Sequence, residues 1–213
     1  MDAIMAYFQT NTEQYVELLI QHIQVSVSAV LIATIIAVPL GILGSQYKWI
    51  EKTATAFTGL MRIIPSLAIL FVLIPYTGTG MRLAVIALIF LAIPPILINT
   101  IVGFTSVSAE VLEAAVSMGM NNRRLFWEIK APLAFPKVFS GIRTSSVEVI
   151  SNATLASYIG AGGLGNLIFT GLSAMRIEYL IIGGASVALL SVIVGLLMTT
   201  VDHRVRRYEF IND

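Results

Sequence analysis

The sequence contains no cysteine, and only 12% of its 213 residues are charged. The absence of cysteine excludes disulfide bonds, thiolate metal sites and a cysteine nucleophile. An average soluble domain has about 25% charged residues, so the scarcity of charge argues against a soluble protein. The chain is also 57% hydrophobic, which indicates that lipid surrounds most of it.

Motifs for nucleotide binding and for hydrolysis are missing as well. No G-x-x-x-x-G-K-[ST] phosphate loop occurs, so any ATP and magnesium must be bound by another chain. The two histidines are far apart and have no acidic cluster beside them, and no serine lies in a G-x-S-x-G context. We therefore expect no catalytic residue, no metal, no cofactor and no nucleic-acid partner for this chain.

Five long apolar stretches are present, and a helix needs about 20 apolar residues to cross a bilayer. They are residues 20–44, 53–74, 81–104, 138–157 and 179–201. The sequence leaves no room for a second, soluble domain. We predict an all-α integral membrane protein whose residues 1–213 form a single transmembrane domain.

Basic residues gather in alternate connections between these stretches. They are Lys48 and Lys52, then Arg123, Arg124, Lys130 and Lys137, and finally Arg204, Arg206 and Arg207. Cytoplasmic connections of membrane proteins carry an excess of Lys and Arg. This pattern predicts that the N-terminus lies outside and that the C-terminus lies in the cytoplasm.

The long basic connection, about residues 105–137, has its own helix signals. Ser108 is a candidate N-cap, and Gly119 is a natural helix stop. A second short helix is predicted to begin at Asn122 and to end at Pro132, because proline lacks the N–H that continues the ladder. The connection should therefore consist of a helix, a glycine elbow and a second helix.

The last connection on the other side is rich in glycine, with four glycines within six residues: Gly160, Gly162, Gly163 and Gly165. Glycine permits positive φ and close backbone approach. Irregular backbone at membrane depth is tolerated only where it is buried in protein or lines a cavity. A re-entrant loop or pore-mouth loop is predicted here.

Three ionisable residues fall inside the predicted spans: Arg62, Arg143 and Glu148. A charge at the centre of a span costs about 2.5–3.5 kcal/mol on insertion scales, so it suggests a function. Arg143 is close to the cytoplasmic end and can extend to the interface. Arg62 and Glu148 lie at similar depths and could pair. Alternatively, each faces a water-filled pathway separately.

Polar residues beside Glu148 fall on one helical stripe: Thr144, Ser145, Ser151 and Asn152. Such a stripe must face protein or water rather than lipid. Two interpretations remain open: a packing interface joined by hydrogen bonds, or a face that lines a transport pathway.

The segment Glu113-Ala114-Ala115, followed by Gly119, Ile129 and Pro132, resembles the EAA loop of ABC importer permeases. Further segments resemble the permease subunits for quaternary-amine osmoprotectants (glycine betaine, carnitine and choline), namely residues 62–70, 93–99, 141–143 and 156–165. This resemblance covers nearly the whole chain after the first span. It implies a type I ABC importer permease fold of five spans in a bacterial cytoplasmic membrane.

The resemblance also implies partners and site residues. The partners would be a second permease subunit, identical or related, two cytoplasmic ATPase subunits and an extracellular substrate-binding protein. The coupling contact with the ATPase would involve these residues: Glu113, Ala114, Ala115, Gly119, Arg123 and Arg124. The pathway or gate would involve a second set: Arg62, Pro65, Ser66, Glu148, Asn152, Gly160, Gly162, Gly163 and Gly165.

Two other functional classes are alternatives. A secondary transporter or channel would usually show inverted repeats and a coupling-ion site, and no internal repeat is visible. Transport that survives the loss of cellular ATP would favour this class. An intramembrane enzyme would need a Ser/His pair or paired acids at membrane depth, where only Glu148 is found.

Overall fold

The computed structural model describes residues 2–205, and its regular elements are all helical. They are α1 (Asp2–Gln46), α2 (Lys48–Ile63), α3 (Ser66–Thr77), α4 (Met81–Thr105), α5 (Ala109–Ser117), α6 (Asn122–Arg124), η1 (Leu125–Lys130), α7 (Ala131–Ala156), η2 (Ser157–Ile159), α8 (Gly165–Ser173) and α9 (Ile177–Val205). The all-α prediction is confirmed. Arg206 and Arg207, used above for the orientation, lie outside the described residues.

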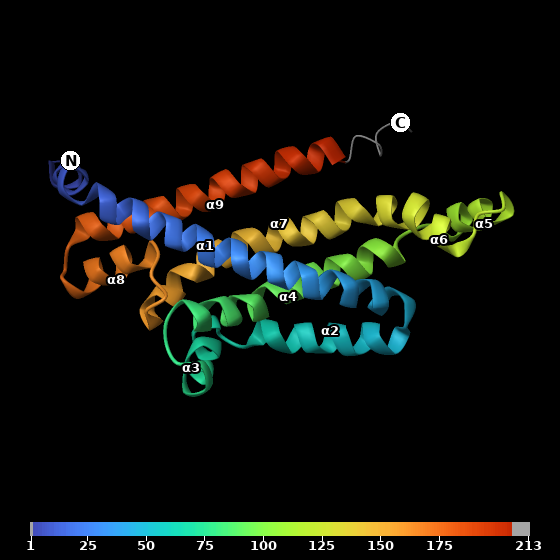
Figure 1. Ribbon diagram of the computed structural model, residues 1–213, viewed down its shortest axis with the longest axis horizontal. Coiled ribbons are helices and arrows are strands. Elements are labelled where there is room, and N and C mark those ends of the chain that lie inside the picture. The colour runs from blue at the N-terminus through green and yellow to red at the C-terminus, as the bar shows by residue number, and fades with distance from the viewer. Residues whose placement is uncertain (1, 206–213) are drawn as a thin grey trace.

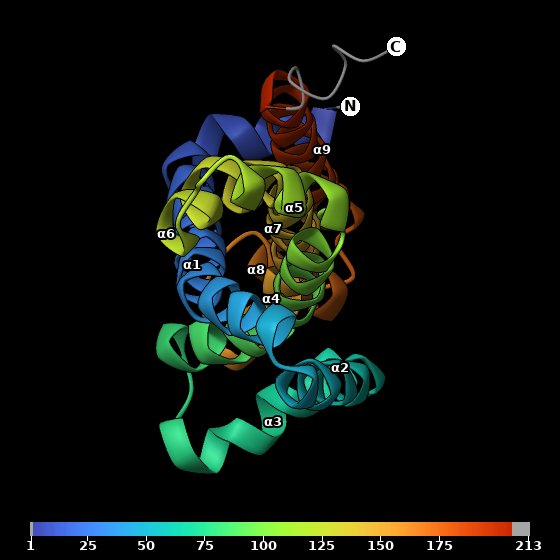
Figure 2. The same ribbon diagram turned by 90° about the vertical axis from the view of Figure 1, so that its right-hand side faces the viewer.

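The long helices α1, α4, α7 and α9 run along the long axis of the molecule (Figure 1). Helix α4 is central and packs against α1, α2, α3 and α7. Helix α9 packs on α7 and α8, and it lies at the edge opposite α2 and α3 (Figure 2). The buried core is therefore built mainly where α1 and α7 meet α4.

Small residues allow these helices to approach one another closely. A β-carbon added at Gly41 of α1 would lie 2.5 Å from Thr100 Cβ of α4. One added at Gly141 of α7 would lie 2.7 Å from Asn99 Cβ, also on α4. In a membrane, helix association depends on such close packing, so these two glycines fix α1 and α7 against the central helix.

The connections lie at alternate ends of the molecule. The α1–α2 turn, the segment α5–η1 and the C-terminal end of α9 point toward one end (Figure 1). The N-terminus, the α3–α4 turn and α8 point toward the other end (Figure 1). The basic residues Lys48, Arg123 and Arg124 therefore share one end, as the sequence predicted.

Among the described residues, three helices are long and apolar enough to cross a membrane, within Ile4–Gln46, Met81–Thr105 and Ile177–Asp202. The predicted third span, 81–104, matches α4 closely. The predicted first span lies inside α1, whose 45 residues include a kink at Asn11, where the backbone is not helical (φ −126°, ψ 21°). The predicted fourth span, 138–157, lies in α7, which is too polar to be among the three.

The expectation of one continuous second span over residues 53–74 is wrong. Helices α2 and α3 are bent by 97° relative to each other at a short break. Ile64 is extended there, with φ −75° and ψ 124°, and Pro65 follows it. The ring of a proline disfavours helical geometry in the preceding residue, which is why the chain leaves the helix at this point. The pair is a broken span or a re-entrant segment.

The predicted helix end at Pro132 is also wrong. Residues 125–130 form the π-helical turn η1, and the helix continues through Pro132 as α7. In this turn the Ala131 N–H donates to Phe126 O, five residues back. Pro132 follows this π-helical turn almost directly, so the helix passes through the proline instead of ending there.

Candidate functional site

A cavity of about 340 Å³ lies where the α2–α3 break meets α4 and α7. Its lining comes from all four helices: Met61, Arg62, Ile64, Ser66, Leu91, Pro94, Pro95, Ile98, Asn99, Thr144, Glu148 and Asn152. Arg62 and Glu148 are the charged members of this lining, and they come from different helices. Both are exposed in the single chain, so the cavity is open on one side.

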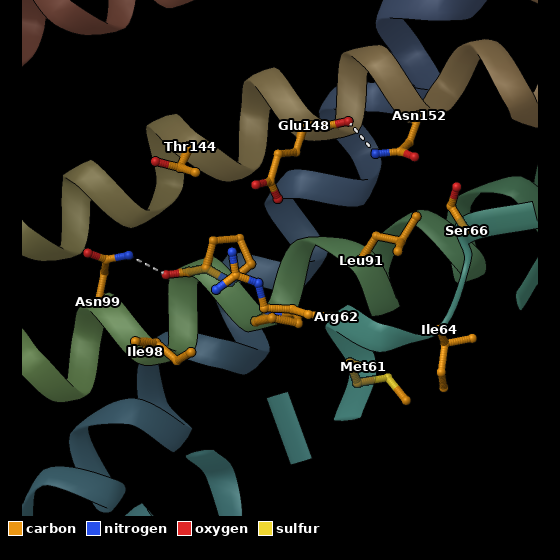
Figure 3. A pocket seen from close by; sticks show the side chains of 12 residues that line it. Met61, Arg62, Ile64, Ser66, Leu91, Ile98, Asn99, Thr144, Glu148 and Asn152 are labelled. Carbon is orange, nitrogen blue, oxygen red and sulfur yellow. Dashed lines mark hydrogen bonds between the residues drawn. The ribbon is translucent and has the colours of Figure 1, made fainter. Parts of the chain in front are cut away.

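The two charges face each other across the cavity. Arg62 lies in the last turn of α2, where the helix dipole favours a cation. Its guanidinium and the Glu148 carboxylate extend toward one another (Figure 3). Nevertheless, no N···O distance within 4.0 Å joins these two described side chains, unlike the Arg124–Glu128 and Arg176–Glu178 pairs. A direct ion pair is therefore not formed in this structure.

The α4 wall of the cavity contains two consecutive prolines, Pro94 and Pro95. Proline has no N–H, so the carbonyls of Phe90 and Leu91 lose their helical donors. The Asn99 side-chain amide donates to Pro95 O at 2.8 Å (Figure 3). The Asn99 side chain thus occupies one of the carbonyl groups of the α4 wall.

The α7 wall is held against α4 by a buried hydrogen bond. Ser145 Oγ donates to Ala92 O at 3.2 Å. One turn beyond Glu148, the Asn152 amide donates to the Glu148 carbonyl at 2.8 Å (Figure 3). The predicted polar stripe is therefore divided, with Ser145 serving packing, whereas Thr144, Glu148 and Asn152 line the cavity.

The residues predicted for a pathway or gate fall into two groups. Arg62, Ser66, Glu148 and Asn152 line the one cavity, and Pro65 lies at the break between two lining residues. The glycines of residues 160–165 lie elsewhere, toward the end that carries the N-terminus (Figure 1). Sequence reasoning missed Asn99, which comes from a span where it had no charged neighbour to mark it.

The glycine segment packs against α1 rather than standing free. Gly160, Gly162 and Gly163 have φ of 82°, 75° and 88°, as predicted for irregular backbone. The Gly163 N–H donates to Gln21 Oε1 at 3.1 Å. A β-carbon at Gly163 would lie 3.1 Å from Nδ1 of His22. Gly163 and Gly165 are thus buried in protein, whereas Gly160 is exposed, and the contacts with α1 were not predicted.

The segment α5–η1 has the predicted helix, elbow and helix start. Ser108 Oγ accepts from the Val111 N–H at 3.3 Å and caps α5. Gly119 has φ of 82°, and Asn121 Oδ1 accepts from the Arg124 N–H at 2.9 Å. The N-cap, the elbow and the second helix start are confirmed.

The surface of this segment combines charge with exposed apolar side chains. Glu113 and Ala114 are exposed, whereas Ala115 is buried within the chain. Met118 and Trp127 expose 79% and 66% of their area. No sequence pattern predicted that they would contact a partner. The segment α5–η1 therefore exposes large apolar side chains as well as charge.

Two arginines at the elbow differ in their surroundings. Arg123 is exposed, and no pair forms between it and any other described side chain. Arg124 Nε donates to Glu128 Oε1 at 2.9 Å, one turn along the helix. This hydrogen bond lowers the pKa of Glu128 below its ordinary value. The pair with Glu128 thus stabilises the start of η1. The charge of Arg123 stays unpaired among the described residues.

Comparison with protein families decides the class of this chain. A family model described as "Binding-protein-dependent transport system inner membrane component" matches residues 9–207. The chain belongs to this family. Curated relatives confirm this membership, because they match along nearly the full length of the chain.

Two curated relatives illustrate the similarity. The carnitine transport permease protein OpuCB of Listeria monocytogenes is 38% identical, over 96% of this chain and 94% of its own length. The glycine betaine/carnitine/choline transport system permease protein OpuCB of Bacillus subtilis is 37% identical, again over 96% of this chain and 94% of its own length.

Solved structures share the fold of the permease. An inward-facing MetNI methionine ABC transporter matches with a TM-score of 0.77 at 17% identity, covering 88% of this chain and 94% of the other. An amino acid ABC transporter with histidines matches with a TM-score of 0.74 at 20% identity, covering 93% and 97%. The type I ABC importer permease fold expected from the sequence is therefore the fold that is observed.

Proposed function

We propose that this chain is the membrane-spanning permease subunit of an ATP-driven importer for osmoprotectants such as glycine betaine, carnitine or choline. One observation carries the substrate class: the chain is 36–38% identical to permeases named for transport of these solutes, over 96% of its length. The permease itself is not an enzyme. ATP and magnesium are bound by a partner ATPase.

In this proposal five segments span a bacterial cytoplasmic membrane: α1, the bent pair α2–α3, α4, α7 and α9. The N-terminus is outside, and the end with α5–η1 is cytoplasmic, because the basic residues gather there. Helix α7 is polar, but α1, α4 and α9 pack around it. Its ionisable side chain Glu148 faces the cavity rather than lipid.

Further subunits complete the importer. A second permease subunit, identical or related, would cover the open side of the cavity, where Arg62 and Glu148 are exposed in the single chain. An extracellular binding protein delivers the solute, and two ATPase subunits bind on the cytoplasmic side. Without a cover of protein or water, charges at membrane depth would be costly.

The segment α5–η1 is proposed to couple ATP binding to the permease. Glu113 offers a charged hydrogen-bond acceptor, and Met118 and Trp127 offer apolar area on the same segment. When the ATPase dimer closes, the segment moves with it and transmits the motion to α7, with which η1 is continuous. The break at Pro65 allows α2 and α3 to change their angle as the pathway alternates.

The test uses the permease co-expressed with its ATPase and binding protein. Glu113→Lys and Gly119→Val should lower solute-stimulated ATP hydrolysis and uptake by at least about tenfold, since a charged contact is worth about 1.5–3 kcal/mol. Glu51→Lys is the matched control, because it reverses a charge near the same end in the first turn of α2.

Two results would contradict the proposal. Normal stimulation in both loop variants would remove the coupling role. Solute uptake that continues after ATP is depleted, with ion gradients intact, would identify a secondary transporter or channel instead.

A further inference from the structure

The cavity at the α2–α3 break separates a positive wall from a negative one. Arg62 comes from α2 and Glu148 from α7, and they extend toward each other across a space of about 340 Å³ (Figure 3). Small-molecule sites typically occupy about 300–1,000 Å³. Since no ion pair within 4.0 Å joins these two described residues, each charge is available to a molecule placed between them.

Two features of the cavity lining favour an anion, the Arg62 guanidinium and the start of α3. Ser66 lines the cavity and begins α3 directly after the break. The first N–H groups of a helix have no intrahelical acceptors, and the helix dipole adds positive potential there. Arg62 and Ser66 flank the same break in the sequence, but the Arg62 guanidinium extends toward Asn99, whereas Ser66 lies on the side of Asn152 (Figure 3). A carboxylate placed beside Asn99 would therefore meet the guanidinium, and the start of α3 lies farther along the lining.

The negative wall has the opposite character. Glu148 supplies a carboxylate, and the Leu91 carbonyl opposite Pro95 has no helical donor. No aromatic side chain lines the cavity, so the cation–π cage that usually binds a quaternary ammonium is absent. Recognition of a cationic group here rests on Glu148.

We propose that this cavity is a transit site for zwitterionic solutes, in which Glu148 faces the quaternary ammonium and Arg62 faces the carboxylate. This inference rests on the proposed function and names the solute class that the permease itself favours. A zwitterion satisfies both charges at once, whereas a solute that carries only a cation leaves Arg62 without its anion. An unmatched charge at such a site is costly.

The consequence is a preference between two solutes that share a trimethylammonium group. Glycine betaine has a carboxylate, and choline has a hydroxyl in its place. The permease should therefore bind and pass glycine betaine better than choline, and Arg62 should be the residue that makes the difference.

A cysteine reporter tests binding in the cavity without the binding protein. The chain has no cysteine, so Asn152→Cys places a single thiol in the lining of the purified importer. Glycine betaine should slow alkylation of this thiol more than choline does at equal concentration. In the Arg62→Gln background that difference should disappear, and in Arg62→Lys most of it should remain. Equal protection by both solutes, or protection by neither, would overturn the inference.

Uptake by the intact importer separates the two proposals. At saturating solute, Arg62→Gln should lower the ratio of glycine betaine to choline transport by about tenfold, as expected for one charged hydrogen bond. Arg143→Gln, a lost cation on α7 outside the cavity lining, should leave the ratio unchanged. If the unmodified importer takes up neither solute, the proposed function fails, and the reporter result still decides the zwitterion site.

Discussion

The elbow at Gly119 projects from one end of the molecule, whereas near the other end Gly162 and Gly163 pack against α1 and Gly165 packs against α7 (Figure 1). Gly119 has φ of 82°, and a β-carbon there would meet no atom within 4 Å. At Gly165 the φ is ordinary, but a β-carbon would overlap the Thr154 carbonyl oxygen and lie 2.5 Å from Ser157 Oγ. One glycine is required by its backbone conformation, and the other by lack of space.

The thermal stability of the permease should be more sensitive to substitution in the packed segment at Gly165 than at the Gly119 elbow. Gly165→Ala forces α8 away from the end of α7, because the Thr154 oxygen belongs to the backbone and cannot rotate away. Overpacking of this kind costs about 1–3 kcal/mol, so the thermal midpoint of the purified permease should fall by several degrees.

Gly184→Ala on α9 is the matched control, since a β-carbon there meets nothing within 4 Å. It should leave the midpoint nearly unchanged. Equal losses in the two variants would show that the close approach at Gly165 is not what stabilises the segment.

A smaller effect is expected where α1 holds the same segment by a side chain. Gln21→Leu removes the acceptor of the Gly163 N–H, which is bonded at 3.1 Å. Leaving a buried donor unsatisfied costs about 1–3 kcal/mol, and amide exchange in residues 157–165 should become faster. Gln24→Leu, on an exposed position of the same helix, should change neither exchange nor thermal stability. Unaltered exchange in Gln21→Leu would show that the bond does not hold the segment.

Local signals explain which parts of the fold were predictable. The limits of α4, the Ser108 cap and the Gly119 elbow depend on residues near in sequence, and they were confirmed. The 97° bend between α2 and α3 was not predicted, although Pro65 was noted within the span. Its size depends on how α3 packs against α4 and α7, and such contacts between distant segments leave no local pattern.

The residues of the candidate site likewise divide into those that the sequence predicted and those that it did not. Arg62 and Glu148 were expected to lie at similar depth because ionisable residues within apolar stretches are conspicuous, and the structure places both in one cavity. Gln21 and Asn99 were missed because uncharged polar residues are common in membrane helices and carry no comparable signal. The gap between Arg62 and Glu148 depends on the orientation of α2, which the sequence does not encode locally.

The smallest loss of stability is expected at the elbow itself. Gly119→Ala must adopt a left-handed conformation, which costs about 1–2 kcal/mol for a residue with a β-carbon, and the stiffer unfolded chain offsets about 0.4–1 kcal/mol of this. The thermal midpoint should therefore fall only slightly. Gly59→Ala, in an ordinary helical position with no atom within 4 Å of the added carbon, controls for the gain in helix propensity and should not lower the midpoint at all.

Gly119→Ala should affect solute-stimulated ATP hydrolysis and thermal stability to different extents. This difference distinguishes the elbow from the packed segment around Gly165. A change in the elbow reorients α5, so solute-stimulated ATP hydrolysis should fall more than the small loss of stability explains. Gly119→Asn should restore most of it, because asparagine tolerates the left-handed conformation better than alanine. If Gly119→Ala lowered the midpoint as much as Gly165→Ala does, the elbow would have to be packed against other groups in the assembled importer. If stimulation stayed normal, the angle of the elbow would not set the proposed docking of Glu113 on an ATPase.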